Sequence, residues 1–218
     1  MGRIMSDSVT RAALAVLALG AACEVSAADA DLTPDVLVKN VTLEVIELVS
    51  KDKDIQAGDR AKTIALVEQK VLPHFNFTRM TALALSTHWA KASAEQKARL
   101  VEEFRTLLVR TYASSIAAYR NQRFDFRPLR ANPADTDVTV TVRVLQPGTQ
   151  PVLIEYDMEK TAAGWKAWDL RVAGISLILN YRTELGNLAR ESGIDGVIRG
   201  LAAKNQALDR SAAAGVRK

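Results

Sequence analysis

The chain has 218 residues, of which 48% are hydrophobic and 25% charged, with a formal net charge of +4 and one cysteine. A chain of this length can bury a core large enough to fold without disulfides. Its basic residues are spread along the chain and form no run, which argues against a nucleic-acid-binding protein.

The N-terminus has the three parts of a secretory signal peptide. Arg3 and Arg11 give a positive start, small and apolar residues fill 12–22 without interruption, and Val25-Ser26-Ala27 offers the small residues that a signal peptidase requires. The apolar run is too short to span a membrane. We therefore predict a signal peptide over 1–27 and export to the periplasm of a Gram-negative bacterium.

Cys23 lies within this predicted signal. A lipidated cysteine is one interpretation, but Gly20 stands three residues before it, where a lipoprotein signal usually has Leu. We favour the other interpretation, in which Cys23 is removed with the signal and the mature chain has no cysteine.

The first elements after the signal are predicted to be helices. Thr33 and Pro34 begin the first one, since Thr can cap a helix and Pro is tolerated at its first position. A polar connection over 51–58 leads to a second helix over about 60–72, and a third covers about 78–90.

The strongest helix signal begins at Ser93. Ser93 and Gln96 have the spacing of a capping box, in which each side chain accepts a hydrogen bond from the other residue's N–H. Apolar residues then recur at helical spacing, and neither Gly nor Pro occurs between Ala94 and Arg120. At about 1.5 Å per residue this helix would be about 40 Å long, more than a small domain needs for packing alone.

The hydrophobic period then changes from 3.6 to 2. Apolar and polar residues alternate over 123–129, 138–144, 154–159 and 168–172, and turn residues separate these runs. Four consecutive strands with short links predict an antiparallel meander with one apolar face.

Helical spacing resumes after Gly174 and ends near Gly193, and a last short helix is predicted over about 197–207. The expected fold class is α+β: a curved four-stranded meander whose apolar face is covered by N- and C-terminal helices. We predict a single domain over 28–208 and a disordered tail over 209–218.

The sequence has none of the common catalytic or metal-binding motifs. His74 and His88 lie on different predicted elements, and neither has a metal-ligand spacing such as H-E-x-x-H. A G-x-S-x-G, a Walker A loop and a G-x-G-x-x-G are all missing. We therefore expect no catalytic residue, no metal and no cofactor.

One enzymatic alternative stays open. Helices followed by a cone-like curved sheet can form a pocket that binds steroids and transfers protons with an Asp and a Tyr, as in steroid isomerases. The strand carboxylates Asp125, Asp157 and Asp169 alternate with apolar positions and are expected to point away from the apolar face. A general base must reach the substrate, so this orientation counts against such an enzyme.

The apolar positions that are expected to face inward fit either a filled core or a lined cavity, and periodicity alone leaves both open. For a cavity, the predicted lining is Leu83, Phe104, Leu108, Tyr112, Phe124, Phe126, Val140, Val142, Ile154, Tyr156, Met158, Trp168, Leu170, Val172, Leu177 and Tyr181.

Two stretches of the chain resemble a known family. The first is Val71-Leu72-Pro73-His74-Phe75-Asn76-Phe77, followed by Met80, Ala84, Leu85, Trp89 and the capping-box helix to Tyr112. The second runs from Trp165 to Leu170, through Gly174-Ile175-Ser176-Leu177 to Asn180-Tyr181-Arg182, and on over 193–198. Their order and spacing, over about Thr33 to Asn205, are similar to those of the MlaC family of periplasmic phospholipid-binding proteins, also called the toluene-tolerance auxiliary family of ABC transporters.

The resemblance implies a carrier that holds phospholipid tails in a pocket between the sheet and the helices and moves between the inner and outer membranes. It implies two partners, an inner-membrane ABC transporter complex with a periplasmic substrate-binding subunit and an outer-membrane lipoprotein assembly, and a role in outer-membrane lipid asymmetry. No catalytic residues come with the family. A hopanoid or sterol-type lipid as cargo, and a structural adaptor of a transporter with a filled core, are the alternatives.

Overall fold

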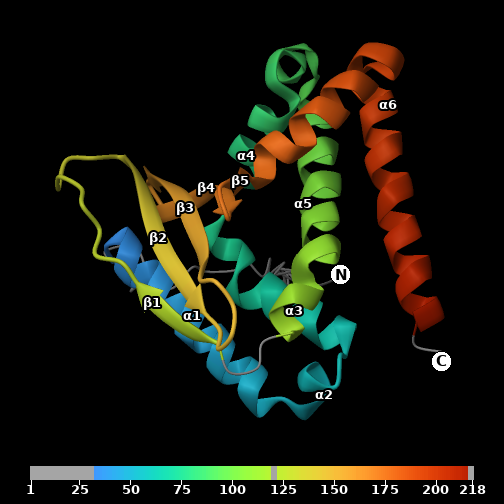
Figure 1. The fold of residues 1–218 in the computed structure, drawn as a ribbon. Coiled ribbons are helices and arrows are strands. Elements are labelled where there is room, and N and C mark those ends of the chain that lie inside the picture. The colour runs from blue at the N-terminus through green and yellow to red at the C-terminus, as the bar shows by residue number, and fades with distance from the viewer. Residues whose placement is uncertain (1–31, 119–121, 216–218) are drawn as a thin grey trace, which may run out of the picture.

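The computed structural model describes residues 32–118 and 122–215 (Figure 1). The predicted signal peptide over 1–27, with Cys23, lies outside the described residues. Helices α1 and α2 lie below the sheet, and α3, α5 and α6 lie beside it (Figure 1).

Helix α1 (Pro34–Lys51) begins at the predicted proline, but the Thr33 side chain makes no capping hydrogen bond. The connection that was predicted to be polar contains a short helix, α2 (Lys53–Gln56). The Asp52 carboxylate caps α2 by accepting hydrogen bonds from the N–H groups of Asp54 and Ile55. Ile55 is buried, so this turn is fixed to the body of the protein by one apolar side chain.

Three further helical segments follow α3 (Arg60–Lys70), namely η2 (Leu72–His74), α4 (Phe77–Leu85) and η3 (Ser86–Lys91). The sequence predicts one helix over 78–90, whereas the structure divides it at Ser86, whose φ is 53°. The long helix α5 (Ala94–Ala117) has the predicted capping box, with hydrogen bonds of 3.1 Å and 3.0 Å between Ser93 and Gln96.

The sheet is the predicted antiparallel meander, with strand order β1-β2-β3-β4-β5. Its strands are β1 (Arg123–Phe126), β2 (Asp137–Leu145), β3 (Val152–Thr161), β4 (Gly164–Val172) and β5 (Ile175–Ser176). The fifth strand was not predicted. It forms because Ala173 and Gly174, with φ of 50° and 80°, turn the chain back onto β4.

A β-bulge in β4 reverses the side-chain alternation. Asp157 pairs with Asp169, but the next residue of β3, Met158, pairs with Ala167, so Trp168 is the extra residue. Ala167 therefore shares the face of Met158, whereas Trp168 lies on the opposite face. We call the face that carries Val140, Val142, Tyr156 and Met158 the apolar face, and the other the polar face.

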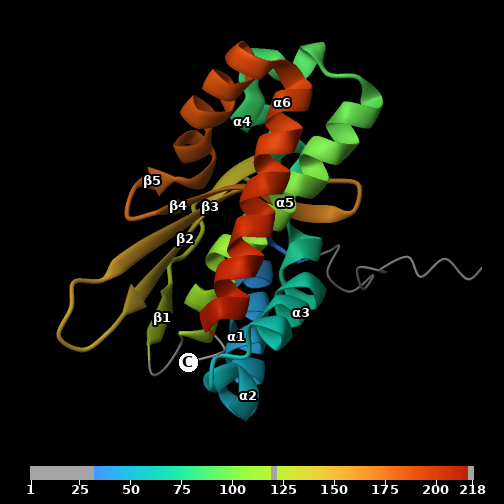
Figure 2. The same ribbon diagram turned by 90° about the vertical axis from the view of Figure 1, so that its right-hand side faces the viewer.

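Helix α6 (Leu177–Gly215) has two arms that meet at Gly193, where φ is 66° and ψ is −174°. Figures 1 and 2 show the second arm turning back to run beside α5. The first arm therefore ends at Gly193, as predicted, and the second arm is the predicted last helix, which extends beyond 197–207. Residues 209–215, which were predicted to be disordered, continue the second arm.

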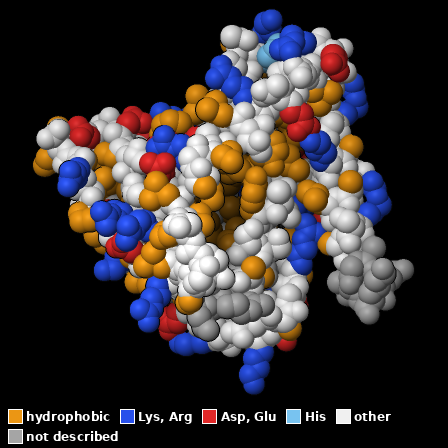
Figure 3. All heavy atoms as spheres, viewed as in Figure 1, with side chains coloured by type: hydrophobic (Ala, Val, Ile, Leu, Met, Phe, Trp, Pro, Cys, Tyr) orange, Lys and Arg blue, Asp and Glu red, His pale blue; other side chains and the backbone are white. Residues whose placement is uncertain are grey.

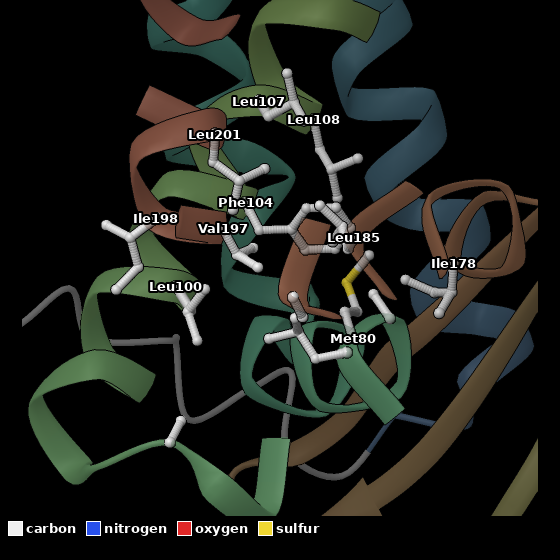
Figure 4. Close-up of a cluster of buried hydrophobic side chains, with 14 residues drawn as sticks. Met80, Leu100, Phe104, Leu107, Leu108, Ile178, Leu185, Val197, Ile198 and Leu201 are labelled. Carbon is white, nitrogen blue, oxygen red and sulfur yellow. The ribbon is translucent and has the colours of Figure 1, made fainter. Parts of the chain in front are cut away.

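The core consists of two apolar clusters. The helical cluster comes from α4, α5 and α6 and includes Met80, Leu100, Phe104, Leu185, Val197 and Leu201 (Figure 4). The sheet cluster consists of Leu37 and Val38 from α1 and of Val140, Val142, Met158, Trp165 and Ala167 from the strands. Phe75 packs against both clusters, and the neighbouring Asn76 N–H donates to the Ala167 carbonyl at 2.8 Å.

Candidate functional site

Along one row of cross-strand partners on the apolar face, the exposure of the side chains rises from β2 to β4. Val142, Ile154 and Val172 pair across the three strands. Val142 is 1% exposed, Ile154 is half-buried and Val172 is 42% exposed. Helix α1 covers the β2 side of this face through Leu37 and Val38. The part of the β4 side around Ile154, Leu170 and Val172 therefore lies outside both clusters, whereas Ala167, on the same face of β4, is buried in the sheet cluster.

The surface is hollowed beside this uncovered region. Figure 3 shows a depression between the strands β3–β5 and α5, with hydrophobic side chains on its walls. We call this depression the central hollow. One wall belongs to the sheet and the other to the helices α5 and α6. The sheet and these helices have separate apolar clusters, and the side chains of one cluster do not fill the space next to the other.

Tyr112 is the most exposed large apolar side chain of α5, at 39%. It lies close to Tyr181 of the first arm of α6. The Tyr181 ring packs edge-on against Phe104, with ring centroids 5.3 Å apart and an angle of 83° between the planes. Phe104 belongs to the helical cluster, so the tyrosine pair is fixed to a rigid support.

Two tyrosines are strongly desolvated although each keeps exposed surface. Burial raises the pKa of Tyr156 to about 12, while a hydrogen bond with Thr42 of α1 opposes this shift. Burial, followed by the contact with Tyr181, raises the pKa of Tyr112 to about 12. Tyr156 packs against the sheet cluster, and the surrounding protein atoms explain its desolvation.

The predicted lining residues fall into groups by burial. Five are almost fully buried in the two clusters: Phe104, Leu108, Val140, Val142 and Met158. Seven are half-buried: Phe124, Phe126, Ile154, Tyr156, Leu170, Leu177 and Tyr181. Three are exposed: Leu83, Tyr112 and Val172. The apolar residues that sequence reasoning grouped together are thus partly core and partly open surface.

Trp168 is not on the apolar face, and its predicted position there is wrong. The Arg79 guanidinium lies 4.2 Å from the centroid of its ring. Arg79 also forms ion pairs with Asp137 at 2.9 Å and with Glu159 at 2.7 Å. Trp168 borders a separate surface pocket of about 330 Å³ on the polar side, together with Thr139, Asp157 and others.

The three strand carboxylates lie on the polar face, as their alternation predicts. Arg143 donates to Asp125 at 3.0 Å, and the Thr139 hydroxyl and Arg171 donate to Asp157 at 2.6 and 2.9 Å. The Ser176 hydroxyl donates to Asp169 at 2.5 Å. None of these three can act as a base in the central hollow, and so the steroid-isomerase alternative lacks its required carboxylate among them.

Within residues 32–118 and 122–215, no group of His, Cys, Asp and Glu side chains could hold a metal ion. None of the helices in this part of the chain combines the length and the apolar character that crossing a membrane requires.

Residues 39–203 match the model of the MlaC protein family. The intermembrane phospholipid transport system binding protein MlaC of Haemophilus influenzae is 22% identical over 172 residues, which cover 78% of this chain and 80% of that protein. The toluene tolerance protein ttg2D of Pseudomonas putida is 26% identical over 127 residues, 56% of this chain and 59% of that protein.

A solved structure has the same fold. The phospholipid-binding protein from Ralstonia solanacearum, determined in complex with a phospholipid, superposes with a TM-score of 0.77 at 32% sequence identity. The superposition covers 82% of this chain and 99% of that one.

Proposed function

This chain belongs to the MlaC protein family, and we propose that it is a periplasmic carrier that binds the acyl chains of a phospholipid in the central hollow. The observation that carries the proposal is the uncovered β4 side of the apolar face, which lies across the hollow from α5. The bound phospholipid of the Ralstonia solanacearum protein, which has the same fold, supports it.

We assign the lining to the half-buried and exposed apolar residues and not to the fully buried ones. On the sheet these are Ile154, Tyr156, Leu170 and Val172, whereas Phe124 and Phe126 of β1 pack against the sheet cluster at the opposite edge of the sheet. On the helices they are Leu83, Tyr112, Leu177 and Tyr181. The predicted lining residues Val142 and Met158 would instead support the wall from behind, since each is 1% exposed.

The free energy of transfer explains why such a site suits a carrier. Two acyl chains of roughly fifteen methylenes each oppose transfer into water by about 24 kcal/mol, at ~0.8 kcal/mol per methylene. An apolar hollow removes most of this penalty, so the tails have nearly the same free energy in the protein as in a bilayer. Loading and unloading can then be decided by small differences in affinity that partners supply.

The carrier would exchange lipid with two membrane assemblies. We propose an inner-membrane ABC transporter complex with a periplasmic substrate-binding subunit as one partner and an outer-membrane lipoprotein assembly as the other. Family membership and the predicted export signal support this role, which would contribute to outer-membrane lipid asymmetry. We propose no catalytic role, because the strand carboxylates Asp125, Asp157 and Asp169 lie on the polar face.

Lipid analysis of the purified protein tests this function. The full-length gene is expressed in its native host, and the exported protein is purified without detergent and extracted with organic solvent. Mass spectrometry should find diacyl phospholipid in near-stoichiometric amount. A hopanoid in its place would support the alternative cargo. Protein that carries no lipid, and that after delipidation takes none from phospholipid vesicles, would contradict the carrier function.

A further inference from the structure

The row of cross-strand partners on the apolar face ends in an exposed side chain. Ile175 of the edge strand β5 pairs directly with Val172, and paired residues of antiparallel strands share a face. Exposure rises along the row from 1% at Val142 to 42% at Val172 and 67% at Ile175. The apolar wall of the central hollow therefore continues to the edge of the sheet.

The turn that leads into β5 carries this apolar row out of the protein body. Ala173 and Gly174, with φ of 50° and 80°, fold β5 back onto β4, and Figure 2 shows the turn standing out beside β5. Leu179, four residues after Ile175 at the start of α6, is 59% exposed. Ile175 and Leu179 are the two most exposed large apolar side chains of residues 32–118 and 122–215.

Two arginines follow Leu179 on the same face of the first arm of α6. Arg182 and Arg190 stand three and eleven residues after Leu179, and both spacings return to one face of a helix. Both side chains are exposed. The Arg182 guanidinium donates to the Ser86 hydroxyl at 2.8 Å, and the Arg190 guanidinium donates to the Asn187 side-chain oxygen. Both guanidinium groups thus have neutral partners.

Arginines on the sheet side of the molecule have carboxylate partners instead. Arg79, Arg143 and Arg171 form ion pairs at 2.7, 2.9 and 2.9 Å. In the first arm of α6, the Glu184 carboxylate is paired with Lys204 of the second arm. Within the described residues, the two arginines that follow Leu179 are therefore left without an ion pair.

Exposed aliphatic side chains beside such arginines fit the surface of an anionic bilayer. The aliphatic groups enter the boundary between headgroups and acyl chains, and the cations attract anionic headgroups. A bilayer yields around a protruding turn, whereas a protein surface would need a matching cavity. The row from Ile175 through Val172 to Ile154 would also keep an acyl chain against apolar side chains on its way into the hollow.

We propose that Ile175, Leu179, Arg182 and Arg190, which we call the rim, dock the protein on anionic phospholipid bilayers, and that acyl chains enter the hollow across this edge. This inference rests on the proposed function. Two aliphatic side chains and two charges give a weak contact, so the docked protein can leave the membrane again.

Vesicle flotation tests the docking. Exported protein, purified and delipidated, is mixed with vesicles of phosphatidylcholine or of equal parts phosphatidylcholine and phosphatidylglycerol, and the bound fraction is measured. The wild type should bind the anionic vesicles more tightly. This binding should weaken as the ionic strength rises from about 0.1 M to about 1 M, because the Debye length falls from about 10 Å to about 3 Å.

Single variants separate the two contributions. Ile175→Thr and Leu179→Gln should each weaken binding to anionic vesicles by about tenfold, because each removes aliphatic surface that the bilayer would bury. Arg182→Gln and Arg190→Gln should each weaken it by about fivefold and leave binding to phosphatidylcholine vesicles unchanged.

Two matched controls carry the same exchanges elsewhere. Leu43→Gln alters a side chain of α1 that is 45% exposed, and Arg210→Gln alters an exposed arginine near the end of the second arm of α6. Both controls should bind vesicles as the wild type does.

Lipid uptake tests the entry route. The double variant Arg182→Gln/Arg190→Gln should take up lipid from anionic vesicles more slowly, in proportion to its weaker docking. The same variant should load to the wild-type level when cyclodextrin supplies the lipid, because that route needs no membrane and both side chains lie outside the wall of the hollow.

Wild-type protein that binds neither kind of vesicle, or rim variants that all bind as the wild type does, would overturn the inference and would leave the rim to an acidic protein surface. Unchanged uptake from vesicles despite weaker docking would overturn the entry route. Wild-type protein that takes up no lipid from vesicles or from cyclodextrin would contradict the proposed function itself, which keeps the failures distinct.

Discussion

Val142 and Ile154 are direct cross-strand partners on the apolar face, yet Val142 is 1% exposed and Ile154 is half-buried. Two neighbouring aliphatic side chains, similar in type and in register, thus lie in different surroundings. Val142 packs in the sheet cluster under α1, and Ile154 lies on the side that the cluster leaves open. The pair allows the hollow to be tested with one kind of substitution at two positions.

We predict that Ile154→Trp fills space meant for acyl chains. The lipid-free variant should keep a melting temperature close to that of the wild type, because the indole enters open volume. Its uptake of lipid from vesicles should be largely lost. Calorimetry and an uptake assay on the same preparation measure both properties.

Val142→Trp is the matched comparison. Overpacking of a filled core costs about 1–3 kcal/mol, and a domain of this size should lose roughly 2–12 °C in melting temperature. Equal losses of stability at both positions, with uptake retained, would mean that the sheet face is filled throughout.

Gly193 is predicted to tolerate no side chain without loss of stability. Its φ of 66° and ψ of −174° lie in a region that only glycine populates readily, and Gly193→Ala should cost about 1–3 kcal/mol. Urea unfolding gives the change in the free energy of unfolding.

Gly186→Ala is the control within the same helix. A Cβ at position 186 would meet only the end of Arg190, at 3.8 Å. Alanine should therefore stabilise the first arm by up to about 1 kcal/mol through helix propensity. A destabilised Gly186→Ala together with an unaffected Gly193→Ala would contradict the two-arm description of α6.

The tyrosines of the hollow predict a loss of stability at high pH. Tyr112 and Tyr156 have pKa values of about 12 in the folded protein, raised from 10.0. Above pH 10 the unfolded chain releases these protons while the folded chain keeps them, so the free energy of unfolding falls between about pH 10 and 12. Below pH 10 neither state ionises, and the contribution is fully present.

Absorbance at 295 nm, which reports phenolate, measures these ionisations directly. At pH 11 Tyr112 and Tyr156 should remain mostly protonated in the folded protein and ionise when urea unfolds it. Tyr156→Phe should remove part of this difference. Complete ionisation of the folded protein's four tyrosines by pH 11 would show that water reaches the hollow freely.

The exported protein is predicted to begin at Ala28 without a lipid anchor. The reason is the Val25-Ser26-Ala27 sequence before the expected cleavage site and the Gly20 three residues before Cys23. Intact mass spectrometry of periplasmic protein should give an unmodified chain starting at or shortly after this position. A diacylglyceryl-modified Cys23 would contradict the prediction and would attach the protein to a membrane.

Features that depend on near neighbours in the sequence could be predicted. The capping box of Ser93 and Gln96 involves residues three apart, and the alternation of β2 continues for nine residues without a bulge. Both are therefore visible in the chain itself. The meander follows from short links between such strands, and it is present in the structure.

Features that depend on tertiary packing could not be predicted. One extra residue in β4 moves Trp168 to the polar face, and regular alternation carries no signal for it. Residues 209–215 are helical, and contacts with distant residues hold this end of α6: Arg60 donates to the Leu208 carbonyl at 3.1 Å, and Arg110 forms an ion pair with Asp209. The difference between Val142 and Ile154 likewise depends on where α1 ends its cover of the sheet.

The division of the core into two clusters has a consequence for evolution. Ile154, Leu170 and Val172 belong to neither cluster, so these wall residues bear little of the stability of either one. Substitutions at the wall of the hollow are then mostly neutral for folding and are selected by the cargo alone. A lineage with this architecture can change the lipid it carries by a few substitutions, while the scaffold that presents the wall stays as it is.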